Sequence, residues 1–165
     1  MLASLATTLV CAATAAAAGP TVDVLSLFHQ ALPNVKHQTA VPVLLPASMT
    51  ILTEHTVYAS GSATKSGWEL DLAFARNCGG ADACFLADFS GKKGTTLPGM
   101  TNAKLANGDA AYFHASTCGA SCAPASLWFV HAGVLYSWQD IEVTAQNAKS
   151  FLVGLANQAV SAGPR

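Results

Sequence analysis

The chain has 165 residues, of which 10% are charged and 52% are hydrophobic, and its formal net charge at pH 7 is −1. This length predicts about one domain, and the charged fraction lies far below the roughly 25% usual for soluble domains. Nucleic-acid binding depends on clustered lysine and arginine facing phosphate. Because Lys92 and Lys93 form the only adjacent basic pair, we expect no nucleic-acid binding.

The first eighteen residues are apolar or small and end in four alanines. This pattern is typical of a secretory signal peptide with a small-residue cleavage site, although the usual basic start is missing. The run is short and rich in alanine and threonine, which disfavours a permanent transmembrane helix. Cys11 follows Val10, a poor context for a lipid anchor. We therefore expect residues 1–18 to be removed and residues 19–165 to form one exported domain, periplasmic or secreted, without a transmembrane anchor.

The mature chain is predicted to begin with a helix over Thr21–Leu32, capped by Thr21 and ended by Pro33. Its apolar stripe consists of Val24, Leu25, Phe28 and Leu32. The next segment, Val41–Pro46, contains two prolines. It is therefore predicted to be extended and packed on the core, and not to form a helix or a central strand.

A hairpin is predicted over Gly67–Phe89, because apolar and polar residues alternate along both of its halves. The loop between the halves carries Cys78 and Cys84. If both strands continued to these cysteines, the two side chains would lie on opposite faces. A β-bulge, or a disulfide lying wholly within the loop, would resolve this conflict.

Further strands are predicted before and after this hairpin. Thr50–Ser60 precedes it and is joined to it by a turn over Gly61–Gly67, and a loop over Ser90–Asn102 follows it. Ala110–Thr117 is another strand, and Ser126–Asp140 is a second hairpin that turns at Ala132 and Gly133.

The chain is predicted to end in a helix over Ala145–Val160, capped by Thr144, and a frayed tail over Ala162–Arg165. The order of elements is a helix, a run of strands and a helix, without strand–helix–strand alternation. The predicted class is therefore α+β, with an antiparallel sheet of about six strands and both helices packed on it.

Four cysteines remain beyond residue 18, namely Cys78, Cys84, Cys118 and Cys122, and an even number in an exported chain indicates disulfides. Of the three possible pairings we favour the local one, Cys78 with Cys84 and Cys118 with Cys122. Each bridge closes a short loop and should contribute about 2 kcal/mol. The alternative is a zinc ion held by all four thiolates. The spacings and an oxidising compartment disfavour it.

The motifs Val41–Pro46, Cys78–Phe85, Cys118–Cys122 and Leu127–Tyr136 follow one another in an order that resembles an uncharacterised exported protein family of cyanobacteria and other bacteria. The chain is more distantly similar to an envelope domain of unknown function that ends in a W-x-x-x-G-x-x-Y hairpin and a helix. The resemblance covers roughly Val41–Val160. It implies an extracytoplasmic α+β domain and supplies no catalytic residue.

No catalytic residue is predicted, because the chain lacks a G-x-S-x-G motif and its cysteines are expected to be oxidised. Glu69 and Asp71 share the polar face of one strand, and Asp88 follows on the neighbouring strand. Paired carboxylates can serve a glycosidase, but a solvated sheet face is the simpler interpretation. His114 and His131 could bind a metal if their strands were neighbours, although no metal site is predicted.

Trp68, Trp128, Trp138 and Tyr136 form a possible ligand groove, although core packing is the commoner role of such residues. We therefore expect an exported, disulfide-containing, non-catalytic binding or interaction module that uses no cofactor. Its partner would be an unknown envelope protein or a small apolar ligand held between sheet and helix. The alternative is a small extracytoplasmic hydrolase whose site cannot be recognised in one sequence.

Overall fold

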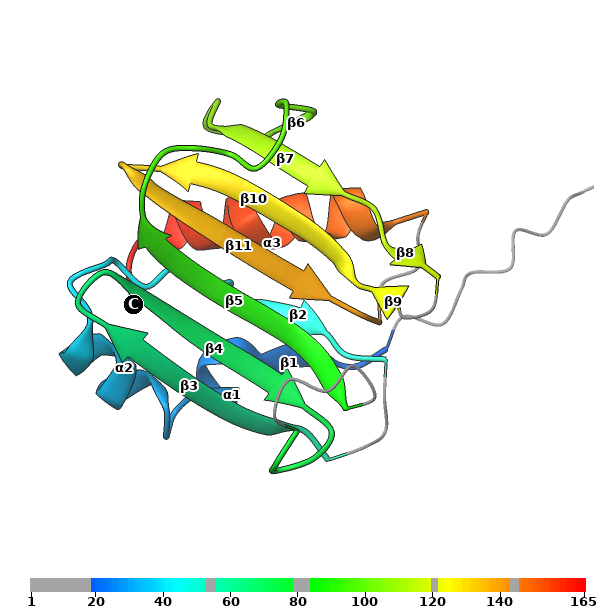
Figure 1. Ribbon diagram of the computed structural model, residues 1–165. Helices are drawn as coiled ribbons and strands as arrows, with labels where there is room; N and C mark the ends of the chain where they lie inside the picture. The colour runs from blue at the N-terminus through cyan, green and yellow to red at the C-terminus, as the bar shows by residue number, and fades with distance from the viewer. Residues whose placement is uncertain (1–18, 53–55, 79–83, 120–121, 143–145) are drawn as a thin grey trace, which may run out of the picture.

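The computed structural model describes residues 19–52, 56–78, 84–119, 122–142 and 146–165 (Figure 1). Their fold is α+β, as predicted. The main sheet is antiparallel and has seven strands, because the two-residue β6 adds to the expected six. In spatial order the strands are β3 (Tyr58–Thr64), β4 (Gly67–Ala73), β5 (Phe85–Lys93), β11 (Val134–Asp140), β10 (Ala125–His131), β7 (Ala110–His114) and β6 (Ala103–Lys104).

Two small ribbons and three helices complete the described part of the chain. The ribbons pair β1 (Thr21–Asp23) with β2 (Ser48–Thr50), and β8 (Thr117–Cys118) with β9 (Cys122–Ala123). The helices are α1 (Val24–Leu27), α2 (Leu32–Gln38) and α3 (Ala148–Ala162). Figure 1 shows the helices and the β1–β2 ribbon on one face of the main sheet. We call this the inner face and the opposite one the open face.

Aromatic side chains from three strands pack together on the inner face. The ring of Trp138 meets those of Phe89 and Phe129 edge-on, with centroids 5.3 Å and 5.2 Å away. Tyr136 stacks on Phe129 at 5.1 Å. Each such pair contributes about 0.5–1.5 kcal/mol beyond the burial of its area. These four side chains, none of them more than 1% exposed, form the centre of the core.

Helix α3 packs against β10 and β11. Its buried residues are Ala148, Leu152, Leu155, Ala156 and Ala159. The helix begins at Ala148, later than the predicted Ala145; residue 145 and the predicted cap, Thr144, lie outside the described residues. None of the helices in the described ranges is long and apolar enough to span a membrane.

The segment Val41–Pro46 is extended and packed on the core, as predicted, with Val41, Val43, Leu44 and Leu45 buried. The Pro42 carbonyl oxygen accepts two hydrogen bonds, one from the Trp68 indole N–H and one from the Tyr136 hydroxyl, both 3.1 Å long. These bonds satisfy polar groups of two large core side chains, since a buried donor without a partner destabilises the fold. The segment is thereby tied to β4 and β11.

The helix predicted over Thr21–Leu32 is shorter than expected: α1 covers only Val24–Leu27, and a second helix, α2, begins at Leu32. Thr21 lies in β1, and Asp23 caps α1 by accepting hydrogen bonds from the Leu25 and Ser26 amides at 2.9 Å and 3.3 Å. Pro33 starts a helix where we expected it to end one: it occupies the first turn of α2. A proline fits there because the first N–H groups of a helix have no intrahelical partner.

The strand predicted over Thr50–Ser60 is also wrong in its bounds. β2 ends at Thr50 and β3 begins at Tyr58, while residues 53–55 lie outside the described residues. The turn predicted over Gly61–Gly67 is shorter, because β3 continues to Thr64. Gly61 suits a packed strand position, since a Cβ there would come within 2.6 Å of Leu70 Cδ2.

The β4–β5 hairpin forms as predicted. It contains both features that could resolve the conflict between the faces of Cys78 and Cys84, a β-bulge and a disulfide within the loop. Its register shifts between Leu72 and Ala73, which marks a β-bulge, and β4 ends before Cys78. Cys78 is bonded to Cys84, and Cys118 to Cys122, which is the favoured local pairing. The loop residues 79–83 between the first pair lie outside the described residues.

The loop predicted over Ser90–Asn102 is shorter than expected, since β5 continues to Lys93 and pairs there with β11. The predicted strand over Ala110–Thr117 divides into β7 and β8. The predicted frayed tail is wrong, because Arg165 is anchored. Its amide donates to the Val43 carbonyl at 2.9 Å, and its guanidinium donates to the Leu45 carbonyl at 3.2 Å and 3.1 Å.

At the β6 edge of the sheet, the Asn102 side chain takes the place of a strand residue. Its amide nitrogen donates to the Phe113 carbonyl at 2.8 Å, and its amide oxygen accepts from the Phe113 N–H at 2.7 Å. One side chain thus satisfies both backbone groups of a β7 residue.

The Pro42 carbonyl gives a testable measure of how firmly the extended segment is tied to the sheet. Tyr136→Phe removes one of its two donors and should lower the free energy of unfolding by about 1 kcal/mol, the net value of a typical hydrogen bond. Urea denaturation measures this. Tyr112→Phe removes a hydroxyl from a half-buried ring on the open face and should change stability less. Equal losses in both variants would contradict the assignment.

Candidate binding face

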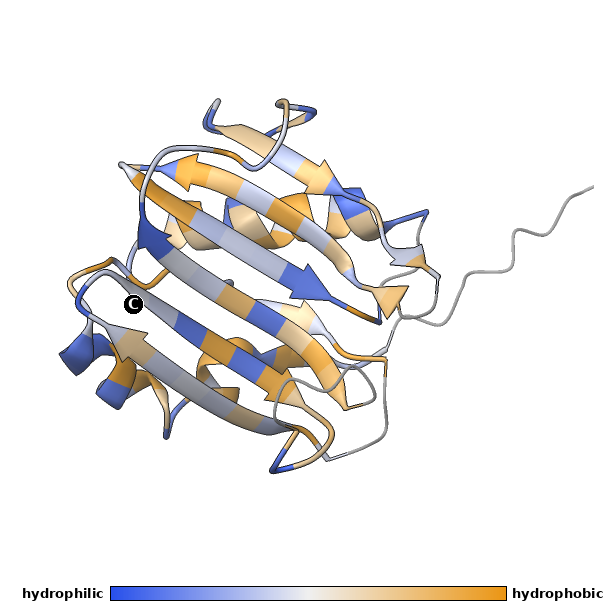
Figure 2. Ribbon diagram, viewed as in Figure 1, coloured by the Kyte–Doolittle hydropathy of each residue, from blue (hydrophilic) through white to orange (hydrophobic). Residues whose placement is uncertain are grey.

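The open face of the main sheet carries polar side chains in two rows, because alternate residues of each strand point to it. Figure 2 shows hydrophilic and hydrophobic residues alternating along β4 and β5. Cross-strand pairing places the following residues in the first row: Ser60, Asp71, Asp88, Gln139, Ser126 and His114. The second row consists of Ser62, Glu69, Ser90, Ser137, Trp128 and Tyr112.

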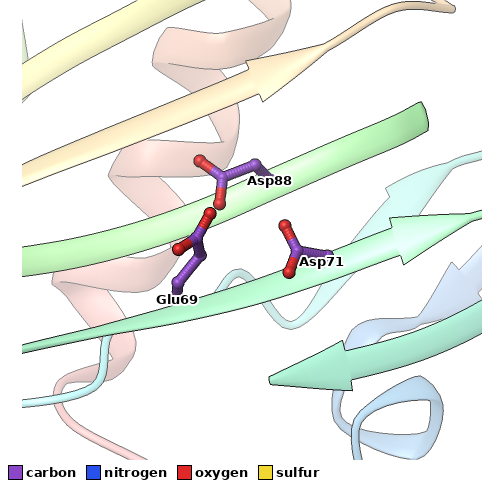
Figure 3. A group of neighbouring side chains, drawn as sticks. All are labelled: Glu69, Asp71 and Asp88. Atoms are coloured by element: carbon purple, nitrogen blue, oxygen red, sulfur yellow. The ribbon is translucent and has the colours of Figure 1, made fainter. Parts of the chain in front are cut away.

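Three carboxyl groups meet where these rows cross β4 and β5. Glu69, Asp71 and Asp88 each offer one oxygen, and the three oxygens lie within 4.8 Å of one another. Figure 3 shows the side chains pointing toward one another from the two strands. We call this group the acidic cluster. Asp71 and Asp88 are direct cross-strand partners, an arrangement that is unfavourable for two like charges.

Exposure decreases across the cluster from Glu69, which is exposed, through Asp71 to Asp88, which is only 9% exposed. Burial, with the charges of Asp71 and Glu69, raises the pKa of Asp88 to about 8. Burial and the charge of Glu69 raise the pKa of Asp71 to about 6. Both shifts have ordinary causes: loss of hydration and repulsion between like charges disfavour the ionised form.

The buried carboxyl of Asp88 is incompletely paired. Its Oδ2 is inaccessible to solvent and has no hydrogen-bond partner. The nearby Ser90 hydroxyl donates to the Ser137 carbonyl at 3.1 Å. Buried polar atoms nearly always have a partner, so an atom without one indicates strain, a functional role or a site for an ion or water.

A groove of about 410 Å³ lies beside the cluster on the open face. Glu69, Ser90, Lys92 and Trp128 are among the residues that line it. The indole of Trp128 stacks on the ring of Tyr112, with centroids 5.7 Å apart and planes inclined by 29°. Both rings are half-buried and therefore present part of their surface to solvent. The groove thus combines hydrogen-bonding groups with part of the aromatic surface of Trp128.

A second groove, of about 330 Å³, lies on the other side of the cluster. Glu69 and Asp71 line it together with Tyr58 and Arg76, whose guanidinium lies 5.1 Å from the Tyr58 ring centroid. Glu69 borders both grooves. The acidic cluster therefore lies between two concave surfaces.

Of the four predicted groove residues, Trp68 and Trp128 line the first groove, whereas Trp138 and Tyr136 do not. Trp68, Trp138 and Tyr136 are buried on the inner face, with 4%, 0% and 1% exposure. Trp128 alone of the four points to the open face. Its partner Tyr112 was missed from the sequence, because their contact depends on how β7 aligns with β10.

His114 and His131, which could bind a metal only if their strands brought them together, lie at opposite ends of β10. His114 pairs with Ser126 at one end of β10, and His131 is the last residue at the other end. The His131 Nδ1 instead lies 2.5 Å from the Asp109 carboxylate. The cysteines are paired as disulfides and so are not available as thiolate ligands.

Comparison of the chain with models of known protein families, with curated proteins and with solved structures gave no match. Function is therefore inferred from the geometry of the open face.

The raised carboxyl pKa values make stability dependent on pH. Between about pH 4 and pH 8 the folded state keeps a proton on Asp88 that the unfolded chain has released, so stability should fall as pH rises through this window. Asp88→Asn removes the ionisable group and should flatten the fall. At pH 8.5 the variant should be more stable than wild type by several kcal/mol, since one pKa unit corresponds to about 1.4 kcal/mol.

Urea denaturation from pH 4 to pH 9, in buffer containing a chelator, measures this dependence. Asp109→Asn removes a carboxylate at the far side of the sheet and should keep most of the wild-type fall. A wild-type stability that rises across the window would show that Asp88 is not held in its protonated form.

Proposed function

We propose that this chain is an exported binding module that holds a polyhydroxylated ligand, such as an oligosaccharide, against the open face of its sheet. The observation that carries the proposal is the half-exposed Tyr112–Trp128 stack beside a groove lined by hydroxyl and charged groups. A sugar ring has apolar C–H faces that pack on aromatic rings and hydroxyls that bond to carboxylate and serine oxygens. Concave sites with a few convergent polar groups are typical of ligand binding.

Binding should depend on the aromatic surface. Trp128→Ala should weaken oligosaccharide binding by about tenfold or more, since an aromatic stacking contact contributes about 0.5–1.5 kcal/mol beyond its buried area. A glycan array identifies the ligand, and titration calorimetry with the best ligand measures the effect. Tyr58→Ala removes an aromatic ring of the same face that lines the second groove, and should retain affinity. Absence of glycan binding, or equal losses in the two variants, would contradict the proposal.

Export is part of the same proposal. Two disulfides support an extracytoplasmic location, because such bonds persist in oxidising compartments. The mature protein, isolated from the periplasm or the medium, should begin close after residue 18 and contain no free thiols when denatured without reductant. N-terminal sequencing and a thiol assay measure both properties. A mature chain that still begins at Met1 would contradict export by a cleaved signal peptide.

A small hydrolase is the second candidate, and the acidic cluster is the observation that favours it. A carboxyl whose pKa is raised to about 8, beside the more exposed Glu69, offers a proton donor and an acceptor within reach of each other. A carboxyl with a raised pKa beside a second carboxyl is a feature of glycosidases. Release of reducing ends from an oligosaccharide panel, lost in Asp88→Asn and Glu69→Gln, would favour the hydrolase over the binding module.

A further inference from the structure

Among the described residues no ion pair joins the acidic cluster to a basic side chain, although Arg76 and Lys92 line the neighbouring grooves. Glu69, Asp71 and Asp88 lie within 4.8 Å of one another. Within the part of the chain that the structure describes, the one recorded ion pair joins His131 to Asp109, far from the cluster. Three carboxylates at such short distances repel one another unless protons or a cation neutralise them.

We propose that Glu69, Asp71 and Asp88 bind a divalent cation, with calcium as the occupant. All the donors are carboxylate oxygens, which hard cations prefer, whereas zinc and copper select nitrogen and sulfur ligands. A buried carboxyl oxygen without a partner, Asp88 Oδ2, belongs to this group. The proposal goes beyond ligand binding in the groove and does not depend on it.

The spacing of the oxygens suits calcium. Calcium–oxygen distances are about 2.3–2.6 Å, so two oxygens on opposite sides of one ion lie about 4.6–5.2 Å apart. Three oxygens within 4.8 Å of one another need to approach a common centre by a few tenths of an ångström at most to contact a single calcium ion. Magnesium binds at about 2.0–2.1 Å and requires near-ideal octahedral geometry, so three carboxylates spread over up to 4.8 Å suit it less well than calcium.

The three residues differ in burial, so the site has a buried side and a side that faces solvent. Asp88, only 9% exposed, would hold the ion from beneath, whereas the exposed Glu69 would hold it from the solvent side. Calcium takes six to eight oxygen ligands, so waters would complete its shell. Because Glu69 borders both grooves, a bound ion would present its free positions to either. A site with few protein ligands should have the affinity of extracellular calcium modules, with Kd of about 0.1–1 mM.

Calorimetric titration of the chelator-treated, dialysed protein with CaCl₂ at pH 7.5 tests the proposal, together with the thermal unfolding midpoint with and without 10 mM CaCl₂. Wild type should bind about one ion, and its midpoint should rise, because a ligand that binds only the folded state stabilises it. Asp88→Asn should weaken calcium binding at least about tenfold and remove the rise in midpoint. Glu69→Gln, an exposed position that leaves the core unchanged, should do the same.

Asp109→Asn is the matched control, since it removes one carboxylate outside the cluster, and it should bind calcium as wild type does. MgCl₂ at the same concentration should raise the midpoint less than CaCl₂. Two results would overturn the proposal: no calcium effect on wild type, which would leave protons as the neutralising species, or an effect of equal size in Asp88→Asn. Because the titration contains no oligosaccharide, failure of glycan binding leaves this result unaffected, and the reverse also holds.

Discussion

The register of β4 against β5 is the constraint on which the open face depends. It sets Asp71 opposite Asp88 and Leu70 opposite Phe89, so one alignment determines both the acidic cluster and the centre of the core. A slip of one residue would turn Asp88 toward the helices and Phe89 toward solvent. The Cys78–Cys84 disulfide and the bulge at the end of β4 fix the hairpin at its far end. The like-charged pair is tolerated because the inner face of the same two strands buries large apolar side chains.

Packing on the inner face of the sheet stabilises the arrangement of side chains on the open face. On the inner face, the ring of Trp138 contacts those of Phe89 and Phe129, so that the contacts run across β5, β11 and β10. These contacts hold the backbone rigidly enough for an unfavourable arrangement to persist on the open face. Functional sites commonly have this property: groups that would relax in a flexible chain are kept close together by packing elsewhere. The acidic cluster is thus an arrangement imposed by the core beneath it.

The sequence predicted what depends on local pattern. Alternation located the hairpins over β4–β5 and β10–β11, and a C-terminal helix was predicted where α3 lies. Prediction from the sequence failed where a residue type fits two positions. Pro33 can end a helix or begin one, and the packing of α2 determines which of the two occurs. The position of Asp88 next to Asp71 was expected from the hairpin. Its burial was not, because the burial of a polar residue depends on neighbours from β11, which is distant in sequence.

The side chain of Asn102 has a consequence for the behaviour of the protein at high concentration. A sheet edge with unpaired backbone groups is a template for another chain, and proteins avoid aggregation by blocking such edges. Here a single amide bonds to both backbone groups of Phe113 and so takes the place at which an incoming strand would pair. At that edge the fold is protected against edge-to-edge polymerisation by one side chain, without a proline or a charged residue at that position.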